Sequence, residues 1–125
     1  MPPEQAYNPP AELVEILQKH QPSAYIFLQK PSGIVKEDVT IISYPFWLIA
    51  SSKLSDDAAY EITKLIYEND EEIQLQGGFL EQWKKETMFD PAPNAPFHEG
   101  AVRFWKEKGL WDAEAEENQK KLLER

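Results

Sequence analysis

The sequence contains no cysteine, which excludes disulfides, thiolate metal sites and a cysteine nucleophile without choosing a cellular compartment. It contains only two histidines, His20 and His98, which lie too far apart in the chain to form a local metal cluster. The glycine patterns that cradle nucleotide phosphates are absent, as are the metalloprotease motif HExxH and the nucleophile motif GxSxG. The motifs therefore predict no cofactor and no metal, and they point to no catalytic residue.

Basic residues are scarce. Thirteen lysines and arginines stand against 22 acidic residues, and the formal net charge is −9 at pH 7. Such a chain repels phosphate backbones and anionic membrane surfaces, so general nucleic-acid binding and membrane-surface binding are disfavoured. Neighbouring carboxylates are so frequent that no single pair indicates a site, since acidic residues are mostly solvated.

Long apolar runs are also missing. The longest, IISYPFWLIA at residues 41–50, is half of the roughly 20 residues that a membrane-spanning helix needs. The N-terminal MPPEQAYNPP has neither the basic n-region nor the apolar h-region of a secretory signal. Taken alone, the sequence predicts a cytosolic protein, provided that residue 1 is the natural start.

The chain has 125 residues, the length of one ordinary domain, and its ten prolines separate several short elements. Apolar periodicity predicts a helix over residues 11–20, ended by Gln21-Pro22. A β-branched and aromatic run predicts a strand over residues 23–29, followed by a turn-rich connection over residues 30–38.

Residues 39–51, VTIISYPFWLIAS, form the second predicted strand, which is apolar at both odd and even positions. A strand that is apolar on both faces is usually covered on both sides, as in α/β sheets. Pro45 cannot donate a ladder hydrogen bond, so a bend, a bulge or a transfer between sheets is expected there.

Four helical segments are expected in the second half, three of which are described first. Ser55 is a predicted N-cap, and the helix over residues 56–70 has an expected apolar face of Ala58, Ala59, Ile62, Leu65 and Ile66. A short helix is predicted over residues 79–89, with Phe79, Leu80 and Trp83 buried. The charged tail WDAEAEENQKKLLER predicts a last helix, because its acidic residues precede its basic ones.

Residues 94–111, NAPFHEGAVRFWKEKGLW, predict a helix that begins near His98 or Glu99 and ends at Gly109. Arg103 is expected to pair with the glutamates four residues away on either side. An acid–base dyad of His98 and a carboxylate would need a third partner and a pocket, and adjacent residues point apart on a helix. The helix start is the favoured interpretation, and a small acid–base enzyme is the alternative.

Two long motifs follow one another here in a familiar order. The first is Leu54-Ser55-Asp56 followed by YEITK at residues 60–64 and Glu68-Asn69; the second is PFHEGAVRFWKEKG at residues 96–109. With ELVEILQKHQPSAYIFLQ at residues 12–29, these motifs resemble the C-terminal part of the TAXI family of solute-binding proteins. That family serves tripartite ATP-independent periplasmic (TRAP) transporters. Glu99 stands where the family has proline, and Phe104-Trp105 stands where it has a Tyr-Tyr pair; both changes keep the helix-start and packing roles.

The resemblance covers residues 11–111 and implies an α/β fold, a partial type II periplasmic-binding-protein-like lobe with a short sheet flanked by several helices. It implies a flexible proline-rich lead-in at residues 1–10, the C-terminal part of the solute-binding fold at 11–111, and a charged C-terminal helix at 112–125. Two complete lobes need roughly 200–300 residues. The resemblance therefore implies that a first lobe and a signal peptide belong to a missing N-terminal part.

The function implied by the resemblance is capture of a small organic anion or amino acid, of the glutamate or dicarboxylate class, in a cleft between lobes. Delivery to the membrane subunits of a TRAP transporter would follow, in the periplasm and without catalysis or cofactor. In such a fold the chain crosses between lobes near the cleft, and residues 39–50 resemble a crossing strand. This places Ser43, Tyr44 and Phe46 near ligand. The alternative is that Tyr44 and Phe46 are core aromatics.

A second class of function is a small α/β protein-interaction module without ligand-binding or catalytic activity. It would recruit a partner through exposed aromatic residues, for which Trp83, Trp105 and Trp111 are the candidates. A partial lobe leaves apolar surface uncovered, and a large exposed apolar patch usually marks an interface. Self-association could then replace the missing lobe.

Overall fold

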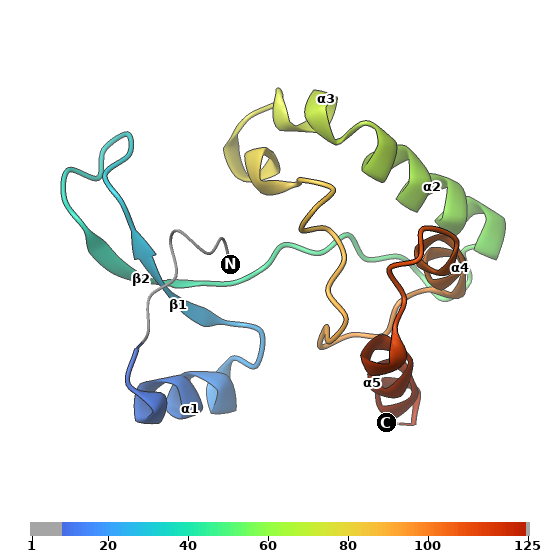
Figure 1. Cartoon of the computed structure of the whole chain (residues 1–125), viewed down its shortest axis with the longest axis horizontal. Helices are drawn as coiled ribbons and strands as arrows, with labels where there is room; N and C mark the ends of the chain where they lie inside the picture. The colour runs from blue at the N-terminus through green and yellow to red at the C-terminus, as the bar shows by residue number, and fades with distance from the viewer. Residues whose placement is uncertain (1–8, 125) are drawn as a thin grey trace. The chain divides into compact units, whose positions relative to one another are not determined.

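The computed structural model describes residues 9–124 (Figure 1). The predicted lead-in falls mostly on residues 1–8, which lie outside the described residues. The chain divides into two compact units, one that ends at Trp47 and one that begins at Leu48. Each unit is described by itself. The division into segments at residues 10 and 111 stays a prediction.

The first unit contains helix α1 (Ala11–His20) and strands β1 (Tyr25–Gln29) and β2 (Val39–Ser43). The helix and the first strand confirm the sequence-based expectations. The strands pair antiparallel, with Tyr25 opposite Ser43 at one end and Gln29 opposite Val39 at the other. Figure 1 shows α1 leading directly into this hairpin. The sheet of this unit therefore consists of two strands, and β2 forms one of its edges.

The expectation of a long second strand covered on both sides is wrong. Strand β2 ends at Ser43, two residues before Pro45, and four of its five residues are exposed. The strand ends there for two reasons. Strand β1 has only five residues that pair with β2, and Pro45 has no N–H to donate to a further ladder hydrogen bond. The chain from Tyr44 to Ala50 runs on without regular structure, and Ile42 is 63 % exposed.

The second unit contains α2 (Asp56–Glu68), α3 (Asp70–Gln74), a 3-10 helix η2 (Gly78–Gln82), α4 (Glu99–Glu107) and α5 (Ala113–Leu123). Helix α2 packs against α4, and Phe104 of α4 is fully buried between them and their neighbours. Its ring meets those of Tyr60 and Tyr67 from α2 edge-on, with centroids 5.8 and 5.4 Å away. These edge-to-face contacts form the centre of this unit's core.

The apolar face expected for α2 is only partly buried. Ala59 is buried, whereas Ile62 and Leu65 are 40 % and 65 % exposed. Helix α4 lies over the side that carries Ala59, Tyr60 and Tyr67, so the aromatic residues take the core positions that the aliphatic spacing had suggested. The hydrophobic period predicted the helix correctly and its buried side only in part.

The predicted helix over residues 79–89 is also wrong, since only the 3-10 turn η2 forms and Phe79 is 52 % exposed. The backbone N–H of Lys85 donates to the buried carboxylate of Asp70 at 3.0 Å, and the Lys85 ammonium lies 3.7 Å from the same group. A buried carboxylate needs such partners. Its demand for a backbone donor accounts for the non-helical path after Gln82.

Helix α5 is attached through two side-chain amides, and that of Asn118 donates to the Pro93 carbonyl at 2.9 Å. Gln119, which is 7 % exposed, accepts from the backbone N–H of Phe97 and donates to the Phe97 carbonyl, both at 2.8 Å. The segment just before α4 thereby gains two hydrogen bonds at a place where no secondary structure supplies them. Among residues 9–124, no helix has the length and apolar character needed to cross a bilayer.

Candidate functional site

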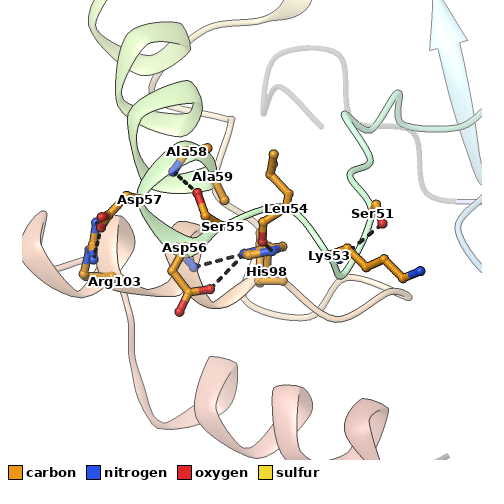
Figure 2. Close-up of polar contacts among 12 residues, drawn as sticks. Ser51, Lys53, Leu54, Ser55, Asp56, Asp57, Ala58, Ala59, His98 and Arg103 are labelled. Atoms are coloured by element: carbon orange, nitrogen blue, oxygen red, sulfur yellow. Dashed lines mark hydrogen bonds and ion pairs between the residues drawn. The ribbon is translucent and has the colours of Figure 1, made fainter.

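The sequence singled out His98, and the structure places it at the first boundary of α4. His98 is the N-cap residue, and its Nδ1 accepts from the backbone N–H of Gly100 at 3.2 Å. Its Nε2 lies 3.0 Å from the carbonyl oxygen of Leu54, to which it donates. Figure 2 shows the ring between the chain preceding α2 and the start of α4. The prediction that a helix begins at His98 or Glu99 is confirmed.

Both ring nitrogens of His98 are therefore used by the backbone. Asp56 Oδ1 lies 3.7 Å from Nδ1, but Nδ1 carries no proton while it accepts from Gly100. An ion pair with Asp56 requires the protonated ring. The neutral ring joins the two helix starts of the second unit, and this use supplies a structural reason for a histidine at position 98.

Replacing His98 by alanine should lower the free energy of unfolding by about 1–3 kcal/mol, because a helix cap and the bond to Leu54 are both lost. His98→Asn should recover part of the loss, since asparagine is a good N-cap but is too short to reach Leu54. Urea unfolding followed by circular dichroism measures both. His20→Ala, at the exposed end of α1, is the matched control, and equal stability of His98→Ala and the parent chain would contradict the assignment.

Arg103 does not pair with the glutamates of its own helix. Its guanidinium donates to Asp57 Oδ1 through both terminal nitrogens at 3.0 Å (Figure 2). The guanidinium also lies 4.4 Å from the ring centroid of Tyr60. Glu107 instead accepts from the Tyr60 hydroxyl at 2.6 Å. The expected i,i+4 pairs are replaced by contacts between α2 and α4, which helix spacing alone does not reveal.

The hydrogen bond to Glu107 raises the pKa of the Tyr60 phenol, because loss of its proton would break the bond and set two negative charges side by side. Slight burial adds to this, and the nearby Arg103 opposes it.

Glu107→Gln should lower the Tyr60 pKa, measured by ultraviolet titration of the phenolate, whereas Glu72→Gln should not. Because the Tyr60 pKa is higher in the folded state than in the unfolded state, the hydrogen bond stabilises the fold at pH values below the ordinary tyrosine pKa. This stabilisation is lost as the pH rises through the raised pKa. An unchanged titration in Glu107→Gln would contradict this.

The proposed ligand residues lie together at the end of β2. Ser43 is the last residue of the strand and is half-buried. Tyr44 and Phe46 follow it, 55 % and 56 % exposed, with their ring centroids 6.0 Å apart and their planes tilted by 44°. The alternative that these two aromatics belong to the core is wrong, because more than half of each is exposed. They form a small exposed aromatic surface directly after the strand.

The tryptophans proposed for an interaction module are not exposed. Trp105 is 4 % exposed, and Trp83 and Trp111 are half-buried, with the Trp111 indole N–H donating to Glu116 at 2.7 Å. Trp47, which sequence reasoning had placed within a covered strand, is 41 % exposed. The signal that could have identified it is the proline two positions earlier, which limits the length of the strand.

Metal binding has no support in the part of the chain that is described. Within residues 9–124, no group of three or more histidine, aspartate or glutamate side chains is arranged to hold an ion. Asp57, Asp70 and Glu107 are engaged with a guanidinium, a backbone donor and a phenol, respectively.

Comparison with known proteins identifies the family. The NMT1-like family matches residues 8–109, which is most of the chain and includes both motifs noted in the sequence. The chain belongs to the NMT1-like family. No match was found among curated proteins or among solved structures.

The NMT1-like family lies within the periplasmic-binding-protein-like group of solute-binding proteins, and its members are typically periplasmic. Membership associates the chain with solute binding in a transport system. The expected fold class, an α/β partial lobe with a short sheet and several helices, is confirmed by the two-stranded sheet, the helices and this family. Solute-binding proteins of this kind are generally not enzymes, which agrees with the structural use of His98.

Proposed function

We propose that the chain acts as the solute-binding component of a TRAP-type transporter of the TAXI kind, or as part of one. The solute is a small organic anion or amino acid of the glutamate or dicarboxylate class. Ser43, Tyr44 and Phe46 contact it, and the membrane subunits of the transporter receive it in the periplasm. No cofactor takes part.

The chain belongs to a family of solute-binding proteins, and one observation supports this site: the rings of Tyr44 and Phe46 contact each other, yet both residues are more than half exposed. Exposed aromatic side chains supply the apolar contact that small-molecule sites use, and the Tyr44 hydroxyl supplies a polar group. Pocket-forming surfaces usually bury most of a ligand. Tyr44 and Phe46 form an open wall on which more than half of each residue is exposed, so this chain alone is expected to bind weakly.

The test uses the complete 125-residue chain with L-glutamate, L-glutamine and succinate. Calorimetry is expected to detect little or no binding in the micromolar range. Amide chemical shifts should nevertheless move at Ser43, Tyr44 and Phe46 when the solute reaches millimolar concentration, where binding free energies are about −4 kcal/mol. Tyr44→Ala should abolish the shifts, and Leu75→Ala, an exposed apolar residue of the second unit, should retain them.

Two outcomes would overturn parts of this proposal. Micromolar affinity in calorimetry would place a complete cleft within these 125 residues and refute the open-wall assignment. Shifts that centre on His98, or an absence of shifts at any solute concentration, would refute the assignment of Ser43, Tyr44 and Phe46.

The alternative function, an interaction module without ligand binding, is favoured by a separate observation. Leu48 and Ile49, at the start of the second unit, are 61 % and 81 % exposed although strongly apolar. Exposed apolar surface of this kind marks partner contacts in many proteins. An absence of solute-dependent shifts together with binding of a partner protein would select this function over solute capture.

A further inference from the structure

The outer edge of strand β2 differs from the rest of the chain in its lack of charge. Residues 40–52 contain no charged side chain, in a sequence whose net charge is −9. Strand β2 pairs with β1 on one side only. In an antiparallel strand, backbone groups that do not face one neighbour face the other side, so an edge strand offers a row of donors and acceptors.

Natural sheet edges are usually protected by lysine or proline, by inward-pointing charges or by a covering element. Strand β2 has none of these within its five residues, and Val39, Ile41 and Ile42 are 40 %, 38 % and 63 % exposed. All five residues of β1, by contrast, are half-buried. Within residues 9–124, the apolar edge strand that has no partner strand on its outer side is therefore β2.

The charges that flank this edge are already neutralised. Asp38, the residue before β2, forms an ion pair at 2.6 Å with Lys30, the residue after β1. Two copies of a chain of charge −9 repel each other over most of their surface. Their approach is least opposed at an edge that has no charge of its own and whose neighbouring acid is paired.

We propose that two copies of this chain associate by antiparallel pairing of β2 with β2, which joins the two hairpins into one four-stranded sheet. A two-fold axis near Ile41 sets Val39 opposite Ser43 of the other copy and Thr40 opposite Ile42, so every pair is uncharged. Such a contact is isologous and closes at two copies. This register also leaves Pro45, which has no N–H to donate, beyond the paired residues.

A second copy of this chain is a better match for this edge than a partner protein that binds through charged groups. The edge presents no charged group that a basic or acidic partner could recognise, whereas it is complementary to itself in both backbone pairing and side chains. The aromatic residues after β2 extend the contact. An aromatic side chain has a surface of about 200 Å². With the exposed fractions of Tyr44, Phe46 and Trp47, these three residues together expose on the order of 300 Å². A standard interface needs roughly 800 Å² per partner, so the dimer is a weak one.

The experiment is sedimentation velocity on the complete chain over a wide range of protein concentration. The parent chain should pass from the monomer of 14.5 kDa to twice that mass as its concentration rises. Ile42→Lys should raise the dissociation constant at least about tenfold, because a buried charge on an edge strand opposes pairing. Ile34→Lys is the matched control, since Ile34 belongs to the same hairpin, lies outside the strands and is 95 % exposed.

A second variant and a spectroscopic check guard against a misfolded hairpin. Val39→Lys should weaken association in the same way as Ile42→Lys, and nuclear Overhauser contacts between β1 and β2 should persist in both. The proposal fails if the parent chain stays monomeric at all concentrations, or if Ile42→Lys associates as well as the parent. It also fails if Ile34→Lys disrupts the dimer equally, or if Ile62→Lys on α2 is the substitution that abolishes it. The sedimentation experiment contains no solute, so a failure of the dimer proposal can be told apart from a failure of the solute proposal.

Discussion

Gly100→Ala should destabilise the second unit by about 3 kcal/mol or more, although alanine is the better helix former by about 1 kcal/mol. Gly100 lies in the first turn of α4, where that helix crosses α2. An added Cβ would lie 2.7 Å from the backbone nitrogen of Tyr60 and 2.8 Å from the Cβ of Ala59, and it would also collide with the Asp56 carbonyl oxygen. Real Cβ atoms essentially never approach other atoms within 3.0 Å.

Two of these neighbours are backbone atoms of α2, so rotation of a side chain cannot relieve the collision. The helices would have to separate, and separation would expose the edge-to-face contacts around Phe104. Small domains are stable by only about 5–15 kcal/mol, so such a loss is a large fraction of the total. Thermal and urea unfolding, followed by circular dichroism, should show a strongly lowered midpoint.

Gly78→Ala is the matched control for this prediction. Gly78 has φ +63°, and an added Cβ would meet nothing within 4 Å, so the substitution imposes backbone strain of about 1–2 kcal/mol without a collision. Gly100→Ala should therefore be the more damaging of the two. A Gly100→Ala chain that is at least as stable as Gly78→Ala would show that α2 and α4 do not approach as closely as described.

Phe104→Ala should cost about 3–5 kcal/mol, since it empties the most completely buried large side chain of the second unit. The Phe104 ring contacts three others: the two tyrosines of α2 already described and Trp105, at a centroid distance of 5.1 Å. Truncation removes the apolar burial and leaves a cavity bounded by aromatic faces, which cannot close without moving α2 against α4. Each lost edge-to-face contact is worth a further 0.5–1.5 kcal/mol or so.

The control for Phe104→Ala is Leu65→Ala on the exposed side of α2, where 65 % of the residue is in contact with solvent. This truncation should change the unfolding free energy by no more than about 0.5 kcal/mol. Urea titrations of the two variants, compared with the parent chain, measure the difference. Equal losses from the two substitutions would mean that α2 buries the aliphatic face which the sequence had suggested.

The local elements were largely predictable because their signals are local. The Ser55 side chain accepts from the backbone N–H of Ala58 at 3.2 Å, as its position before two aspartates predicts. Gly109 has φ 72°, and Leu110 N–H reaches the Trp105 carbonyl at 3.1 Å, which is the helix end that glycine predicts. A cap depends on a few neighbouring residues, and those residues are adjacent in the sequence.

The errors concern partners that are distant in sequence. The buried side of α2 was predicted only in part, because the helix that packs on α2 begins some thirty residues after α2 ends. Its close approach depends on Gly100. The helix expected after Gly78 failed because the carboxylate of Asp70 takes the backbone N–H of Lys85. The strand around Pro45 was predicted to be long and covered on both faces. It ends at Ser43 instead, because β1 has only five residues with which β2 can pair.

The candidate site divides in the same way. The motifs at residues 54–69 and 96–109 predicted membership of a solute-binding group, since such motifs preserve helix starts and packing positions that the sequence records directly. Exposure of Tyr44 and Phe46 could not be read from an apolar run, because burial depends on whether another element covers that run.

The sequence by itself determined the capped starts of α2 and α4, the end of α4, the absence of thiol chemistry and the family of the chain. Caps, residue types and spacing act over a single turn of the backbone, so they are fixed before the chain folds back on itself. Only the tertiary structure decided that His98 joins two helix starts, that Arg103 turns to Asp57 and that the edge of β2 is open. Each of these depends on which surfaces meet in space, and that follows from the packing of the whole unit.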